Sequence, residues 1–153
     1  MGVKFSRTYD QQYIWKCITQ PHVLRSNPDV NMNLDMLFPP ITDDFIWVRV
    51  GKHGVVSFVR IAEGVYDIHL ALAKSIWGRA NVVLYSLFKW FVSKYQDCTQ
   101  LNAAIPDCNL RLLAGIKLFS FHEIGRVYNG YVRDGNPGDM IMVTLNKDKK
   151  WQF

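Results

Sequence analysis

The sequence predicts a single domain, residues 1–153, with an α/β (α+β) fold in which about four helices flank a mixed sheet of roughly six to seven strands. Two observations lead to this prediction. The chain has 153 residues, of which 49% are apolar, and this is enough for one buried core. Segments that alternate like strands are also interleaved with segments of helical spacing, in the order strand, helices, three strands, helix, strand, helix, two strands.

The first part of the chain is expected to form one strand and two helices. A short strand is predicted at residues 2–7, a helix at 11–20 and a second short helix at 22–27. The stretch 27–44 contains three prolines and mixed polarity, so we expect a long irregular connection there. Connections of this length within a small domain often carry function.

Three antiparallel strands are expected next. The runs "FIWVRV" (45–50) and "VVSFVRI" (55–61) flank "GKHG", whose glycines suit a hairpin turn. A second turn near Gly64 leads into "VYDIHLALA" (65–73), which alternates well enough to be a third strand.

Two helices are predicted in the second half, each with an apolar stripe that should face the core. The positions of the first stripe are Ala80, Val83, Leu84, Leu87, Phe88 and Phe91, and those of the second are Leu110, Leu113, Ala114 and Leu118. A strand at 100–105, stopped by Pro106, separates the helices, and Asp107 is expected to cap the second one. Two closing strands, 123–132 and 139–145, should pair around the turn-rich residues 133–138.

Composition and charge exclude some classes of function and leave several classes of partner open. The net charge of +5 favours an anionic partner, such as a phosphorylated cofactor, nucleic acid or an acidic protein. No basic run with interleaved aromatic residues indicates nucleic acid. No apolar stretch approaches the roughly 20 residues of a membrane-spanning helix, and the N-terminus lacks the apolar segment of a signal peptide. We therefore expect no membrane and a cytoplasmic protein.

The cysteines indicate neither disulfides nor a metal site. Cys17, Cys98 and Cys108 are odd in number and far apart, which suits neither a disulfide framework nor a paired-cysteine metal clip. Buried thiols in a reducing compartment are the expected state.

The stretch "SIWGRAN", Ser75–Asn81, stands where the third strand of the meander passes into a helix. A chain that turns into a helix presents unpaired amide groups, and such groups bind anions. Gly78 would permit close approach of a ligand to the backbone, and Arg79 adds a positive charge.

These residues resemble the GNAT (Gcn5-related N-acetyltransferase) superfamily. In that family a loop patterned (Gln/Arg)-x-x-Gly-x-(Gly/Ala) holds the pyrophosphate of acetyl-CoA. Gly78 and Ala80 match the pattern, and Ser75 replaces the first Gln or Arg. The resemblance thus implies an acetyl-CoA site, or one for another acyl-CoA, formed by Ser75, Ile76, Trp77, Gly78, Arg79, Ala80 and Asn81.

Further matches follow in the family's order. "NAAIPDCN" ends at Asn109, where the family has an Asn that starts a helix, and this residue is implied to orient the pantetheine arm. "KLFSFHEIGR" resembles the family's next segment, with Ser120 in place of a glycine before Phe121. "RVYNGYVRDGNPGDMIMVTL" resembles the closing strands of the ribosomal-protein N-acetyltransferase branch, including Asp139.

The sequence departs from the family pattern at the residue that donates a proton to the leaving thiolate. Many members of the family have a Tyr seven residues after the Asn, and here that position is Ile116. Tyr66, Tyr128 or Tyr131 could replace it only if the fold brings one close. Cys108 has no evident base beside it, so we do not expect it to be a nucleophile.

The resemblance implies a base on the strand 65–73, where the family often has a Glu, and Asp67 and His69 are the candidates there. They lie two residues apart and therefore share one face of the predicted strand. His69 could act near neutral pH. The alternative is a hydrogen-bonded polar pair beside the core.

Two functions remain open. The first is acetyl-CoA-dependent N-acyl transfer to a protein N-terminus or a small amine. The second follows from a narrower resemblance to small proteins of tailed phages: a catalytically degenerate GNAT-fold protein with a structural, head-assembly or interaction role, whose partners would be phage assembly proteins and whose location would be the host cytoplasm or the virion. The retained Gly78, Ala80 and Asn109 favour the first, and Ser75 and Ile116 favour the second.

Overall fold

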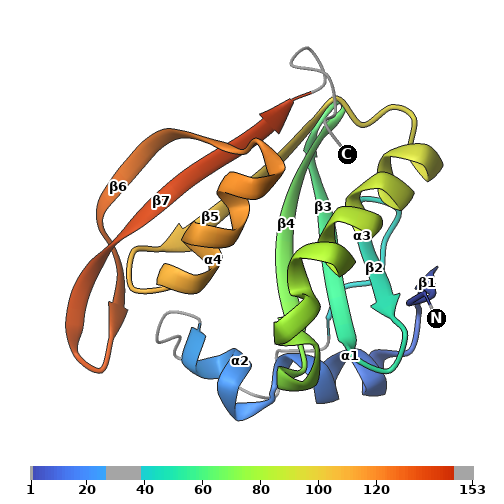
Figure 1. Cartoon of the computed structure of the whole chain (residues 1–153), viewed down its shortest axis with the longest axis horizontal. Helices are drawn as coiled ribbons and strands as arrows, with labels where there is room; N and C mark the ends of the chain where they lie inside the picture. The colour runs from blue at the N-terminus through green and yellow to red at the C-terminus, as the bar shows by residue number, and fades with distance from the viewer. Residues whose placement is uncertain (1, 27–38, 147–153) are drawn as a thin grey trace.

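The computed structural model describes residues 2–26 and 39–146. Within them the chain forms seven strands, four α-helices and two 3₁₀ helices, in the predicted order (Figure 1). Their bounds are β1 (Phe5–Arg7), α1 (Gln11–Ile18), α2 (Pro21–Ser26), β2 (Phe45–Val50), β3 (Gly54–Ala62), β4 (Val65–Leu72), η2 (Lys74–Arg79), α3 (Ala80–Lys94), β5 (Gln100–Pro106), α4 (Leu110–Ile116), η3 (Lys117–Phe119), β6 (His122–Arg133) and β7 (Asn136–Asn146). The predicted irregular connection at 27–44 lies largely outside the described residues.

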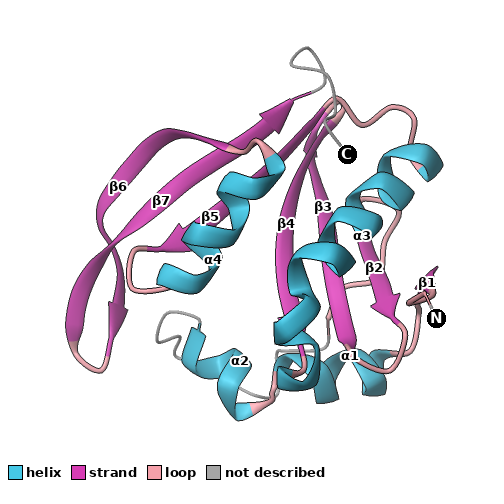
Figure 2. Cartoon of the chain, in the orientation of Figure 1, coloured by secondary structure: helices cyan, strands magenta, loops and turns pink. Residues whose placement is uncertain are grey.

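The seven strands form one mixed sheet in the order β1-β2-β3-β4-β5-β7-β6, which confirms the predicted fold class. Neighbouring strands are antiparallel except β4 and β5. These two parallel strands pair only from Val65 opposite Gln100 to Asp67 opposite Asn102. Beyond that point they diverge, and α4 lies in front of the gap (Figure 2).

Helices cover both faces of the sheet. On one face α3 packs through Phe91, whose ring stacks on Phe58 of β3 at 3.7 Å between centroids. On the other face Ile14 and Cys17 of α1 and Val23 of α2 form a second cluster, with residues of β2, β3 and β4. Because side chains alternate along a strand, β4 contributes Ile68 to the first cluster and Ala71 to the second.

The predicted apolar face of α4 is wrong in part. Leu110 and Leu118 are 74% and 68% exposed, while Ile116, which was not placed on that face, is buried. The predicted cap is also wrong, because the Asn109 side chain, not Asp107, accepts a hydrogen bond from the Leu112 amide. The physical reason is that this helix borders the gap between β4 and β5 and does not lie wholly on the core.

The closing hairpin is longer and its turn tighter than predicted. Arg133 pairs with Asn136, so the turn consists of Asp134 and Gly135, both with positive φ. Two consecutive residues of this kind form the turn that suits the twist of a hairpin. The register of β6 shifts between Val127 and Tyr131, and after this irregularity the Tyr131 ring lies against Gly138 of β7.

Candidate functional site

A cavity of about 880 Å³ opens where β4 and β5 diverge. Leu84 and Phe88 of α3 line it on one face of the sheet, while Val23 of α2 and Trp47 of β2 line it on the other. The cavity therefore runs through the gap between the two strands. Its volume suits a drug-sized or cofactor-sized ligand.

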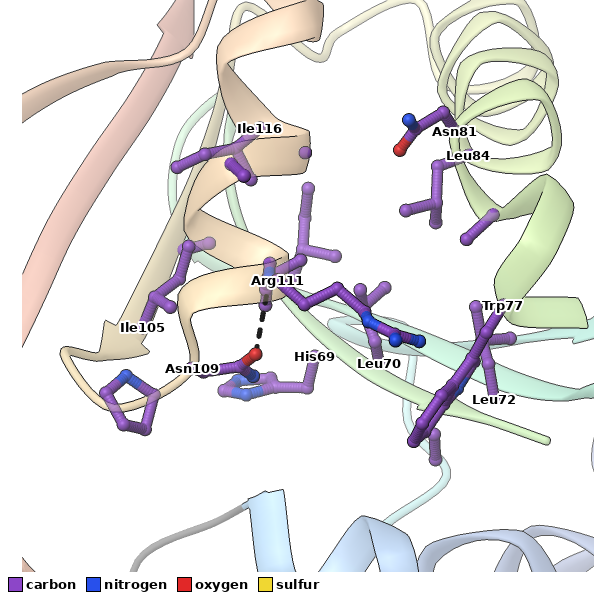
Figure 3. A pocket seen from close by; sticks show the side chains of 18 of the residues that line it. His69, Leu70, Leu72, Trp77, Asn81, Leu84, Ile105, Asn109, Arg111 and Ile116 are labelled. Carbon is purple, nitrogen blue, oxygen red and sulfur yellow. Dashed lines mark hydrogen bonds between the residues drawn. The ribbon is translucent and has the colours of Figure 1, made fainter. Parts of the chain in front are cut away.

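His69 lies on β4, two residues beyond its last pairing with β5, and its side chain lines the cavity (Figure 3). The residue is exposed by its accessible surface, although nearby protein still partly desolvates its ring. Burial lowers the pKa of His69 below its usual value, and the Asp67 carboxylate acts in the opposite direction. A neutral imidazole that can accept a proton therefore faces the cavity at neutral pH.

Asp67 is not brought to the cavity. It belongs to the last residue pair between β4 and β5, and the cavity begins beyond it. The two residues share a strand face as predicted, but only His69 is placed to act on a ligand in the cavity.

Asn109 stands at the N-terminus of α4, on the cavity wall. Its Oδ1 accepts from the Leu112 amide at 3.2 Å, which leaves the amide nitrogen as the donor that Asn109 can offer to a ligand (Figure 3). Because the capping bond fixes the side chain, this donor is held in place before a ligand arrives.

The stretch Ser75–Asn81 forms η2 and the first turn of α3, where an open loop was expected. The amides of Ile76 and Ala80 bond to the carbonyls of Ala73 and Trp77, so they are not free for an anion. Trp77, Ala80 and Asn81 line the cavity. The others of this stretch do not, and Ile76 is a core residue.

Trp77 is surrounded by basic side chains. Arg111 of α4 lies over its ring with the guanidinium carbon 4.8 Å from the centroid, and Lys74 lies over it at 5.9 Å. The ring of His22 meets the indole edge-on at 5.5 Å. Arg111 thus reaches from one wall of the cavity to the other (Figure 3). The sequence pattern did not single out Arg111 or Lys74, because their proximity depends on how α4 sits against η2.

The predicted substitutes for the missing tyrosine are dispersed. The Tyr66 hydroxyl donates to Asp97 at 2.9 Å, and burial and this hydrogen bond raise the pKa of Tyr66. Tyr128 is 76% exposed, and the Tyr131 hydroxyl donates to Asp107. None of the three lines the cavity, whereas Ile116 does.

Two further findings concern metal binding and membrane-spanning helices. No group of three or more His, Cys, Asp or Glu side chains within residues 2–26 and 39–146 could hold a metal ion. Over the same residues, no helix has the length and apolar character needed to cross a membrane.

The fold is that of the GNAT acetyltransferases, as solved structures show. The ribosomal-protein-S5-alanine acetyltransferase of Vibrio fischeri matches with a TM-score of 0.71 and 14% identity, over 99% of this chain and 94% of that chain. A probable acetyltransferase of the GNAT family from Chromobacterium violaceum matches with 0.76 and 12%, over 100% and 91%. The spermidine N-acetyltransferase of Vibrio cholerae, solved with CoA and spermine, matches with 0.76 and 12%, over 96% of each chain.

Sequence comparisons add no closer relationship. No protein-family model matches the chain, and no curated protein does. The narrower resemblance to phage proteins receives no support from the structural matches, so it stays a prediction.

Proposed function

We propose that the protein is an acyl-CoA-dependent N-acyltransferase that transfers an acetyl group from acetyl-CoA to an amine. One observation carries the proposal: the cavity lies between parallel strands that stop pairing after Asp67, with His69 and Asn109 on its walls. Acetyl-CoA would supply an activated thioester. The chain's own residues would bind it, orient it and manage the protons.

Gly78 supports a phosphate site beside η2. Its φ is not positive, and a Cβ built there would meet no heavy atom within 4 Å. Neither the backbone nor the packing requires glycine at this position. We infer that the open space beside Gly78 admits the pyrophosphate, whose charge would be met by side chains and not by free amides of η2.

Charge at this end of the cavity fits the same ligand. Arg79 is exposed and takes part in none of the ion pairs formed within the described residues. Lys74 and Arg111 flank Trp77 nearby. Arginine pairs with phosphate through two parallel hydrogen bonds, so Arg79 and Arg111 can supply the charge that Ser75 does not.

His69 and Asn109 would carry the steps at the thioester. Neutral His69 accepts the proton that the attacking amine loses. The Asn109 amide nitrogen donates a hydrogen bond that orients the pantetheine arm along the cavity. Asp67 is proposed only to influence His69 through its charge.

The acceptor amine would enter from the face covered by α1 and α2, where Val23 and Trp47 line the cavity. No Asp or Glu lines it among the described residues. A polyamine needs several carboxylates to balance its charges, whereas a single amine on a largely uncharged carrier does not. This argues against a polyamine and in favour of an acceptor with a single amine, either a protein N-terminus or a small monoamine.

Calorimetric titration with acetyl-CoA at moderate salt tests the proposal. We expect saturable one-to-one binding and a higher melting temperature, because a ligand that binds the native state stabilises it. Gly78→Leu should weaken binding by more than about tenfold without lowering stability. Gly125→Leu is the matched control, since a Cβ at Gly125 also meets nothing within 4 Å and this residue of β6 does not line the cavity.

Absence of binding at millimolar acetyl-CoA would contradict the proposal and return attention to the structural or assembly role. Binding that is unchanged in Gly78→Leu would retain the function but remove the phosphate site from η2.

A further inference from the structure

The proposed reaction needs a proton donor for the departing thiolate, and the described residues that line the cavity include one thiol and no hydroxyl. Ile116 occupies the position of the family's tyrosine, and the tyrosines at 66, 128 and 131 do not line the cavity. Among the described residues that line it, Cys108 is the one thiol or hydroxyl. Cys108 is exposed, whereas Cys17 and Cys98 are buried in the core.

Cys108 is placed across the gap from the proposed base. It follows the end of β5 and directly precedes Asn109, the cap of α4, whereas His69 projects from β4. Cys108 thus lies in the turn between β5 and α4 and His69 lies on β4, and both residues line the same cavity. Acyl transfer to an amine is accelerated by a base that accepts the proton of the amine and by an acid that protonates the leaving thiolate.

Two side chains of β6 hold the sulfur. Arg133 Nη1 donates to Cys108 Sγ at 3.3 Å. The Tyr131 hydroxyl donates to the Asp107 carboxylate and also interacts with the Cys108 side chain. These two contacts fix the position of the Cys108 side chain.

Tyr131 belongs to β6 but contacts Asp107 and Cys108, which follow β5. In the sheet, β7 separates β6 from β5, so the tyrosine must cross β7. It does so over Gly138, its partner in the register, where a Cβ would overlap the tyrosine ring. The register shift before Tyr131 includes Asn129 with a φ of 50°, whose amide donates to Asp139 at 3.0 Å.

We propose that Cys108 is the proton donor to the leaving thiolate, a role that rests on the proposed function. As the amine nitrogen forms its bond to the thioester carbonyl carbon, the carbon–sulfur bond breaks. The Cys108 S–H proton passes to the departing sulfur, which leaves as a free thiol. The proton lost by nitrogen goes to His69. Solvent then carries a proton from His69 back to the Cys108 sulfur, so the protein ends unchanged.

The first test measures alkylation of Cys108 by iodoacetamide, followed by mass spectrometry. Cys108 should react readily in the free protein and at least tenfold more slowly with saturating CoA, because the CoA thiol would occupy the space beside it. Calorimetry under the same conditions verifies saturation. Equal reaction rates in the saturated complex would overturn this inference, whereas failure of CoA to bind would overturn the proposed function itself.

The second test separates catalysis from structure by changing the leaving group. With acetyl-CoA, Cys108→Ala should lower kcat by about 100-fold, a typical contribution of general acid catalysis. With an acetyl ester of an aromatic thiol, whose thiolate leaves without protonation, we expect the loss to be less than about threefold. An alanine-initiated peptide and spermidine serve as acceptors, and water serves if neither is acetylated.

Tyr128→Phe is the control variant, because it removes an exposed hydroxyl from β6 away from the cavity. It should leave both rates unchanged. An equal loss with both donors in Cys108→Ala would overturn the inference, since a merely structural defect does not depend on the leaving group. No turnover by the unaltered protein with any of these acceptors would count against the proposed function.

Discussion

Ser57 of β3 lies directly opposite His69 of β4 in the sheet, and its buried hydroxyl makes no hydrogen bond within the described residues. Directly opposed residues project on the same face, here the one covered by α1 and α2. Ser57 is only 1% exposed. An unpaired hydroxyl beside the proposed base is costly to stability, and such costs concentrate at functional sites.

Ser57→Ala is therefore expected to stabilise the protein by about 1 kcal/mol, because it removes a buried group without a partner. Chemical denaturation measures this change in the free energy of unfolding. Ser6→Ala, at an exposed position of β1, is the control and should change little. A marked loss of stability in Ser57→Ala would show that the hydroxyl has a partner in solution.

His69 should make the free energy of unfolding decrease as the pH falls. Its folded-state pKa is lowered, chiefly by burial, so the unfolded chain binds a proton more readily than the folded one. This contribution is fully present above about pH 6.5, the ordinary histidine pKa, and is lost as pH falls toward the folded-state pKa. Unfolding free energies of the unaltered protein and His69→Gln, compared at pH 7.5 and 5.5, should show a smaller acid-induced loss in the variant.

The same shift has a kinetic counterpart. If His69 is the base, activity at saturating substrate should persist below pH 6.5 and decline only as the imidazole becomes protonated. His69→Gln should lose this acid limb together with most of the activity. An unchanged pH profile in a still active variant would exclude His69 as the base.

The order of the elements followed from the sequence because it depends on local periodicity. The runs 45–50 and 65–73 alternate like strands, and the stripe from Val83 to Phe91 has helical spacing. The buried face of α4 was less predictable. Leu110 and Leu118 border a cavity that exists because β4 and β5 diverge, and the local sequence pattern of α4 does not show this divergence. An apolar stripe does not tell whether it faces a core or a ligand site.

Sequence alone could identify a site residue only where a local motif marks it, and not where its role depends on a contact with a distant segment. His69 and Asn109 were identified because they stand where the family resemblance implies a base on a strand and an Asn at a helix start. The contact of Arg133 with Cys108 joins residues 25 apart in the sequence and depends on the register of the β6–β7 hairpin. Arg111 over Trp77 depends on how α4 packs, so periodicity carried no signal for it.

Ser120 offers a test of the family pattern in this chain. It takes the place of a glycine in the resemblance, and its φ is 61°, in the left-handed region. A residue with a Cβ is strained there by about 1–2 kcal/mol, so Ser120→Gly should raise the free energy of unfolding by up to about 1 kcal/mol. Ser86→Gly, within the exposed part of α3, should act in the opposite direction. A destabilising effect of Ser120→Gly would mean that the contacts of the serine outweigh the strain.

Asn109 has two roles that substitution can separate. Asn109→Ala removes the cap of α4 and should lower the free energy of unfolding by about 1 kcal/mol. Asn109→Asp keeps an oxygen that can accept from the Leu112 amide, so stability should stay near that of the unaltered protein. It removes the amide donor, however, and places a negative charge where a CoA thioester would lie. We therefore expect both variants to bind acetyl-CoA weakly in calorimetry although only the first is destabilised. Normal binding by Asn109→Asp would show that the residue serves the helix alone.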